Sequence, residues 1–228
     1  MTYPTRKRIA CAFVVGALLA LAGCTSVPDK VAFDPALFPR QPAETTFDGR
    51  VAVLADPAAV AMTVTGESVS RGPHLLGAPA QVPIGRVVHE AALAAFADTF
   101  RGGAPTAERA GAEPGAPTVA LRVVHYDYHN RRLDSLTLPF LTVWVVVWEK
   151  WRLDLQLTIE LRLLDVDGAV LWSNVYDSGL RTWEHEAPER NLEELVRMTH
   201  ETAFALMRDA ARDVGEWLRN ERLRERRL

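Results

Sequence analysis

The segment from Arg152 to Val166 constrains the fold of this chain most, because apolar and polar residues alternate along it. A period of two puts successive side chains on opposite faces of a β-strand, so the pattern predicts a half-buried strand with one wet face. The apolar face carries Leu153, Leu155, Leu157, Ile159, Leu161 and Leu163. The turn residues 165–168 end in Asp-Gly, which tolerates the backbone angles of a tight hairpin, so a returning antiparallel strand is expected over 169–176.

The remaining periodic segments are shorter strands and two helices. Alternating or β-branched runs predict strands over 50–54, 61–65 and 119–128, the first two forming a hairpin. Apolar residues at helical spacing predict helices over 83–100 and 191–220. This order predicts an α+β fold in which two helices pack on one face of a mostly antiparallel sheet of about five strands.

The N-terminus has the pattern of a cleaved targeting segment. Basic residues at 6–8 precede an apolar stretch over 9–21, which is too short for a membrane span. The following Leu21-Ala22-Gly23-Cys24 resembles the lipobox of bacterial lipoproteins. That resemblance implies a signal peptide over 1–23 and a diacylglycerol and an acyl chain, such as palmitate, on Cys24. The alternative is an ordinary secretory signal in which Cys24 is incidental.

The same resemblance implies a location for the mature protein. Thr25 stands where an aspartate would retain an enterobacterial lipoprotein in the inner membrane. The anchor is therefore expected in the inner leaflet of the outer membrane, facing the periplasm. The proline-rich stretch 24–47 predicts a flexible tether, followed by one domain over 48–220 and a basic tail over 221–228.

Charge and cysteine content narrow the function classes. The chain has 26 Lys and Arg against 29 Asp and Glu, and loss of Arg6, Lys7 and Arg8 with the signal peptide would change the net charge from −3 to −6. This balance argues against general nucleic-acid binding. Of the two cysteines, Cys11 lies in the signal peptide and Cys24 carries the lipid, so no disulfide is expected in the mature domain.

Several pieces of the mature chain resemble small periplasmic lipoproteins of the YajG-like and ABC-transport auxiliary groups. The matching pieces are the valine strand over 51–54, the Ile84-Gly85 helix opening, the hairpin over 163–172 and the long closing helix. The resemblance implies a largely non-enzymatic protein that assists lipid or export machinery through protein contacts. This chain differs by an insertion between Asn130 and Trp151.

The insertion holds the candidate contact residues. Residues 136–148 carry no charged side chain. One interpretation is an apolar loop or ribbon that contacts a protein partner, a lipid or the bilayer. The other is a buried strand that continues directly into the amphipathic strand at Arg152. The residues expected to make the contact are Leu138, Phe140, Trp144, Trp148 and Trp151.

Catalytic and metal-binding patterns are weak. His125 and His129 would share one strand face about 13 Å apart, which is too far for one metal ion. Glu184-His185-Glu186 has acid and base groups but is expected in a solvated loop or at the start of a helix. No phosphate loop, nucleophile elbow or paired zinc motif occurs in the sequence.

The sequence therefore favours a non-enzymatic protein with no cofactor beyond the lipid on Cys24. The predicted function is a binding or assembly accessory in the cell envelope, with the membrane and an envelope protein as partners. The alternative is a lipid-binding accessory of an envelope transport system that holds an acyl chain between sheet and helices.

Overall fold

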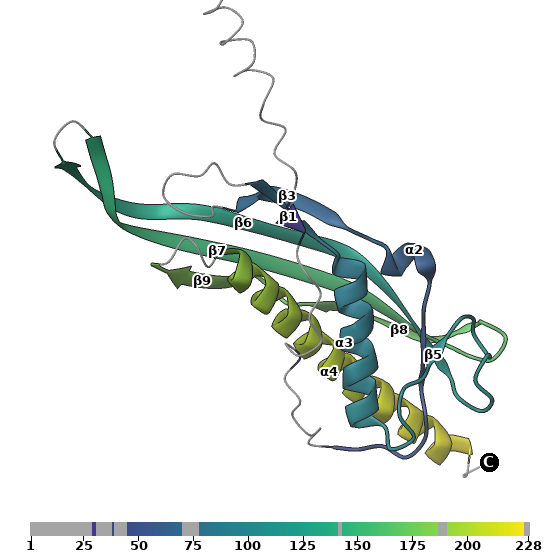
Figure 1. Ribbon diagram of the computed structural model, residues 1–228. Coiled ribbons are helices and arrows are strands. Elements are labelled where there is room, and N and C mark those ends of the chain that lie inside the picture. Colours follow the sequence, from purple (N-terminus) through teal and green to yellow (C-terminus); the bar gives the residue numbers. More distant parts are fainter. Residues whose placement is uncertain are drawn as a thin grey trace, which may run out of the picture.

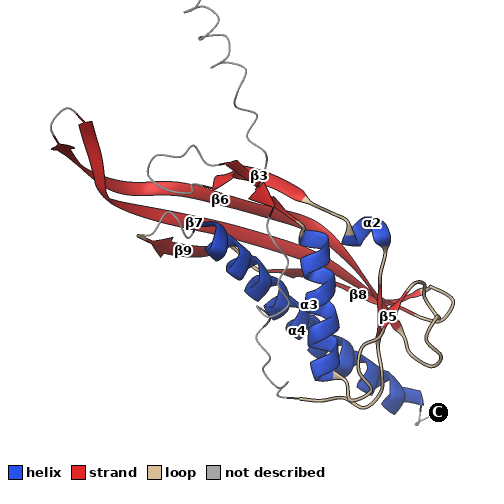
Figure 2. Cartoon of the chain, viewed as in Figure 1, coloured by secondary structure: helices blue, strands red, loops and turns tan. Residues whose placement is uncertain are grey.

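The computed structural model describes residues 29–30, 38, 45–69, 78–140, 143–186 and 191–225. The predicted signal peptide and Cys24 lie outside these residues. Within them the chain forms two sheets and three helices, as Figure 1 shows in chain order and Figure 2 by type of element. The α+β class predicted from the sequence is confirmed.

The larger sheet has six strands and mixed directions. Its order is β5-β2-β6-β7-β8, and β9 also pairs with β7. The strands are β2 (Ala52–Leu54), β5 (Thr106–Ala107), β6 (Thr118–Phe140), β7 (Val143–Leu164), β8 (Val170–Asp177) and β9 (Arg181–His185). The neighbours of β2 are parallel to it, whereas the other pairs are antiparallel.

A second, three-stranded sheet lies beside β6. It consists of β1 (Asp29–Lys30), β4 (Ala78–Val82) and β3 (Val64–Val69), in that order. Tyr128 of β6 joins the two sheets, because its hydroxyl donates to the Ala80 carbonyl at 2.9 Å. Tyr128 is buried at this junction.

Two long helices pack together on one face of the larger sheet. They are α3 (Ile84–Thr99) and α4 (Asn191–Glu225), and a single-turn helix α2 (Pro57–Val60) precedes them. Both long helices contact each other and the sheet (Figure 1). The helix α4 extends to Glu225 and so includes most of the predicted basic tail.

Three parts of the predicted architecture are wrong. The sheet is mixed rather than mostly antiparallel, and the described chain has three helices rather than two. The strands near 50–54 and 61–65 do not form a hairpin, because they belong to different sheets. Asp56 explains the separation: its side chain accepts from the Ala58 amide at 3.0 Å and caps α2, which leads the chain away from β2.

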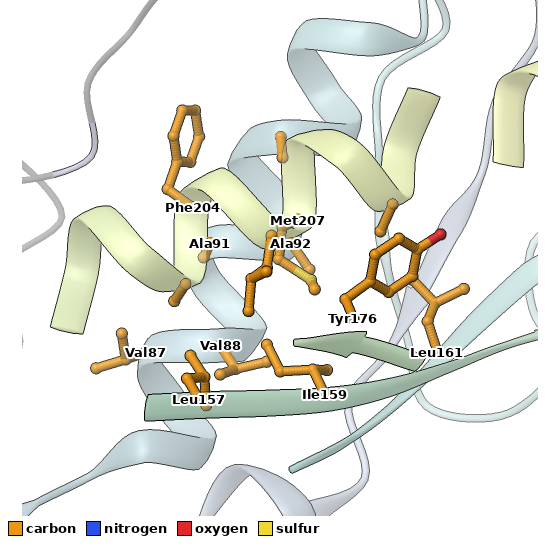
Figure 3. Packing of buried hydrophobic residues seen from close by; sticks show 14 of the residues in the cluster. Val87, Val88, Ala91, Ala92, Leu157, Ile159, Leu161, Tyr176, Phe204 and Met207 are labelled. Carbon is orange, nitrogen blue, oxygen red and sulfur yellow. The ribbon is translucent and has the colours of Figure 1, made fainter. Parts of the chain in front are cut away.

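The core lies between β7 and the two long helices. All six apolar residues predicted for the buried face of the amphipathic strand have no solvent exposure. Figure 3 shows Leu157 and Ile159 of β7 below Val88 and Ala92 of α3, with Met207 of α4 above them. Side chains of this chain therefore occupy the space between sheet and helices, where the alternative function would place an acyl chain.

The proline-rich segment before the domain is not free along its whole length. Asp29 and Lys30 pair in parallel with Ala80 and Gln81 of β4. Phe38 is buried, with its ring 5.2 Å from the ring of His200 and 5.9 Å from that of Phe204. The sequence predicted a flexible tether here because prolines interrupt any regular spacing of apolar residues. Pairing of two residues with a strand and burial of one aromatic ring do not require such a regular spacing.

No helix in the described ranges is both long enough and apolar enough to cross a membrane.

The contact between α4 and Phe47 gives a testable prediction. A Cβ atom at Gly215 would overlap the buried Phe47 ring. Gly215→Ala should therefore lower the free energy of unfolding by about 1–3 kcal/mol, although alanine favours a helix interior by about 1 kcal/mol. Urea unfolding measures the change, and Glu216→Ala at the exposed neighbouring position is the matched control. A more stable Gly215→Ala protein would contradict the close packing of Phe47 on α4.

Candidate functional site

Residues 136–140 and 143–148 of the uncharged segment form the far end of a long β-hairpin. The pairing of β6 with β7 runs from Thr118↔Leu164 to Phe140↔Val143. The pairing of β9 with β7 ends at Trp151↔His185. Beyond this pair, residues 136–140 and 143–148 pair only with each other among the described strands, and we call them the distal ribbon. Figure 1 shows the distal ribbon extending past both long helices.

Both interpretations of the insertion can be compared with this arrangement. The direct continuation of residues 143–148 into the amphipathic strand is confirmed, because β7 is continuous from Val143 to Leu164. Residues 136–140, however, belong to β6. Pro139 lies at the outer edge of the distal ribbon, where a proline fits because no neighbouring strand needs its missing amide donor.

Two register shifts reverse the polarity of the hairpin faces. Shifts occur between Arg132 and Asp134 and between Leu136 and Thr137. In the part of the hairpin nearer the helices, one face points toward the helices and carries the leucine core. We call the opposite face the outer face. There it carries polar and charged residues such as Asp127, Arg131, Gln156 and Asp154. Beyond the first shift, register places Ser135, Glu149 and Thr137 on the helix side.

The outer face of the distal ribbon is wholly apolar by register. Directly opposed residues of antiparallel strands share a face, and faces alternate along each strand. The outer-face set is Leu136, Leu138, Phe140, Val143, Val145 and Trp148. This apolar stripe is separate from the leucine core, which lies on the opposite face of the hairpin. By register, the stripe does not continue the leucine face of β7.

Register also divides the five candidate contact residues. Leu138, Phe140 and Trp148 belong to the outer-face set, whereas Trp144 and Trp151 lie on the helix side. Trp151 has a specific partner, because its indole Nε1 donates to Glu149 Oε2 at 3.0 Å. The other four candidates are placed here by backbone register alone.

Charged pairs surround the base of the distal ribbon. We call them the polar collar: Arg131, Arg132, Glu149, Lys150, Arg152, Asp154 and Glu184. Every cation of the collar has a carboxylate partner. The nitrogen–oxygen distances are 3.5 Å for Arg131–Asp154, 2.8 Å for Arg152–Asp154, 3.4 Å for Arg132–Glu149 and 2.7 Å for Lys150–Glu184.

Asp154 is the centre of this collar. Only 7% of the residue is exposed, and burial acts to raise the pKa of its carboxyl. Hydrogen bonds from Arg152 Nε and Thr182 Oγ1, at 2.8 and 2.7 Å, together with the charges of Arg152 and Arg131, lower it further than burial raises it. The net pKa of Asp154 lies below its ordinary value, so the carboxylate stays ionised.

The Glu184-His185-Glu186 segment is not the expected loop or helix start. Residues Arg181–His185 form β9, because they complete the backbone pairing of β7 between Trp151 and Leu155. The hydrogen bond from Lys150 lowers the pKa of Glu184. The His185 ring stacks on Trp183 with centroids 4.3 Å apart. These contacts are those of a structural edge strand.

His129 of β6 pairs with a residue of its own strand. His129 Nε2 lies 3.0 Å from Asp127 Oδ2, and both side chains are about half exposed. No group of three or more potential metal ligands occurs among the described residues.

The sequence analysis missed a pocket beside α3. Its volume is about 400 Å³, and it lies where α2, the start of α3 and β6 meet. Met62, Val88, Leu121 and Val123 line it, and burial lowers the pKa of His89 at its wall. No sequence signal could have predicted it, because its walls come from four separate segments.

Comparisons with known proteins give no family. No protein-family model matches the chain, and no curated protein matches it. Several solved structures are similar, among them the following three. A provisionally named lipoprotein from Caulobacter crescentus CB15 is 17% identical, with a TM-score of 0.37, covering 75% of this chain and 91% of that one.

The other two structures have similarly low sequence identities and TM-scores. A provisionally named homolog of the neuraminyllactose-binding hemagglutinin from Helicobacter pylori is 10% identical, with a TM-score of 0.39, covering 86% of this chain and 100% of that one. A minor lipoprotein from Acinetobacter baumannii is 12% identical, with a TM-score of 0.29, covering 76% and 94%. Two of the three neighbours are thus named as lipoproteins, but likenesses this low support no argument about the function of this chain.

The lowered pKa of Asp154 predicts a pH dependence of stability. Because the folded-state pKa lies below the ordinary value of about 3.9, the ionised carboxylate stabilises the fold above that value, and this stabilisation is lost as the pH falls toward the folded pKa. Asp154→Asn should cost about 1–2 kcal/mol at neutral pH and flatten the decline in stability under acid. Urea unfolding across the acid range measures both effects, with Asp167→Asn, at an exposed turn, as the control. An equally steep decline in the variant would contradict the role of Asp154.

Proposed function

We propose that this protein is a lipid-anchored, non-catalytic accessory of the cell envelope that acts by docking through its distal ribbon. The lipobox-like Leu21–Cys24 segment supports the anchor, and Thr25 supports the inner leaflet of the outer membrane, facing the periplasm. The periplasmic α+β domain then presents the hairpin to an envelope component.

The observation that carries this proposal is the apolar outer face of the distal ribbon. Six apolar residues lie together on a two-stranded ribbon that no other described strand extends. Isolated two-stranded ribbons are only marginally stable in water, and contiguous apolar patches usually mark contact sites. A docking role explains why this part of the hairpin lacks charge while most residues on the rest of the same face are polar.

The anchor and the domain are close along the chain. Only the residues between Cys24 and Asp29 separate the proposed lipid from β1. At about 3.3–3.6 Å per extended residue, this linker spans at most about 18 Å. The three-stranded sheet is thus held near the membrane, and the docking target lies within reach of a hairpin based there.

The arrangement of acids and bases supports a non-catalytic role. Glu184 and Asp154 are the collar carboxylates with lowered pKa values. Glu184 is paired with Lys150, and Asp154 is paired with Arg131 and Arg152. A general acid or base needs a free proton-transfer position and a pKa near the working pH. These carboxylates have neither.

The anchor is tested by replacing its nucleophile. Cys24→Ser should yield an unprocessed or soluble protein, because only a thiol can accept the diacylglycerol. Membrane fractionation and the mass of the mature protein measure this, and Cys11→Ser, in the segment expected to be removed, is the control. Unchanged fractionation and mass of Cys24→Ser would overturn the anchor assignment.

The docking role predicts that the distal ribbon contributes little to stability. Leu138→Ser combined with Val145→Ser should change the free energy of unfolding by less than about 0.5 kcal/mol, as at non-core sites. Leu155→Ala, within the core on the same strand, should cost about 2–5 kcal/mol.

Docking itself is measured in cells. A photo-crosslinking residue at Phe140 should form adducts with an envelope component, whereas the same residue at Val124, exposed on the same strand, should form none. A large loss of stability in the double variant would show that the distal ribbon is core, and equal crosslinking at the two positions would remove the docking role.

A further inference from the structure

We propose that the docking target of the distal ribbon is a phospholipid bilayer, and that the outer face lies in the boundary between headgroups and acyl chains. This inference rests on the proposed docking function and names its target. It assigns the six outer-face residues as the lipid-contacting set and the polar collar as the part at headgroup level.

Composition favours lipid over a protein groove. A groove would cover one face of the ribbon, yet both faces of the distal ribbon are poor in polar residues beyond Thr137. Register places Pro139, Trp144 and Val146 opposite the outer-face set. An apolar medium that surrounds a thin element accommodates this pattern, and tryptophans are enriched at membrane interfaces.

Dimensions limit how deep the ribbon can lie. From Leu136 to Phe140, β6 covers about 16 Å at 3.3 Å per residue, less than the bilayer core of about 30 Å. The outer edges of the distal ribbon pair with no other described strand. Unpaired backbone groups are costly in hydrocarbon but are satisfied by water and headgroups at the interface. The ribbon is therefore placed within the interface, where both faces contact lipid and the outer face lies deeper toward the acyl chains.

The polar collar indicates which lipid property is recognised. All four cations of the collar are within 4 Å of carboxylates. A collar neutralised in this way adds little attraction for anionic headgroups. Apolar insertion then supplies the contact, so zwitterionic phosphatidylcholine is sufficient.

The position of the proposed anchor brings the bilayer to the ribbon. The lipid on Cys24 lies within a short linker of β1, and β1 belongs to the sheet joined to β6 through Tyr128. The same membrane that holds the lipid is therefore available to the hairpin without any other partner.

The small number of cysteines allows the bilayer contact to be tested with a single labelled thiol. The two cysteines are Cys11, in the proposed signal peptide, and Cys24, whose thiol the lipid would occupy. A cysteine introduced elsewhere is then the only free thiol of the lipidated protein. We would place it at Val145, on the outer face, at Val146, its neighbour on the opposite face, and at Val124, in the exposed part of β6.

Each variant is labelled with an environment-sensitive fluorophore and reconstituted, in its lipidated form, into phosphatidylcholine vesicles containing nitroxide-labelled lipid. The label at position 145 should show a blue shift and a loss of emission that exceed those at 146, and the label at 124 should show neither. Adding phosphatidylglycerol should leave the quenching unchanged. Matching melting curves of the three proteins verify that each is folded.

Quenching at 145 no greater than at 124 would overturn the bilayer target, and so would quenching that requires phosphatidylglycerol. Absence of quenching together with a doubled native mass would identify a second copy of the chain as the occupant instead. If position 145 is unquenched but the Phe140 crosslinker captures an envelope protein in cells, the bilayer inference fails and the docking function stands. If there is neither quenching at position 145 nor crosslinking at position 140, both the bilayer inference and the docking function fail.

Discussion

The antiparallel ladder between β6 and β7 is the interaction on which the rest of the structure depends. It runs the full length of both strands, and every other layer is placed by it. On its helix side β7 supplies the leucine face that α3 and α4 cover (Figure 3). On its flanks β2, β8 and β9 complete the sheet, and Tyr128 ties β6 to the second sheet. The ladder thus links the buried core to the distal ribbon.

Two register shifts exchange the faces of one hairpin. Because faces alternate with a period of two, inserting one residue in a strand exchanges the faces beyond it. The extra residues near Leu133 and Val147 bring the apolar stripe to the outer face of the distal ribbon, while the core leucines remain on the helix side. The residues of the polar collar lie next to the first register shift, and their cations and carboxylates form ion pairs with one another. The leucine face and the apolar stripe thus lie on opposite faces of one hairpin.

Local sequence patterns predicted the elements whose stability comes from one periodic face. The alternation over 152–166, the Asp-Gly turn and the helices α3 and α4 were all readable, because a half-buried strand or amphipathic helix repeats its environment along the chain. Irregular elements were missed. The strand β4 lies in a segment rich in glycine and proline, β5 has two residues, and β9 contains few apolar residues, so each exists only through backbone pairing with a distant strand.

By itself the sequence determined the α+β class, the leucine face, the lipobox-like segment ending at Cys24 and the uncharged character of residues 136–148. Only the tertiary structure decided the direction of the β2 neighbours, the pairing of Asp29–Lys30 with β4 and the division of the candidate contact residues between two faces. The reason is physical. Composition and period are properties of one segment, whereas register, strand direction and a bulge are properties of two segments that meet across the sheet.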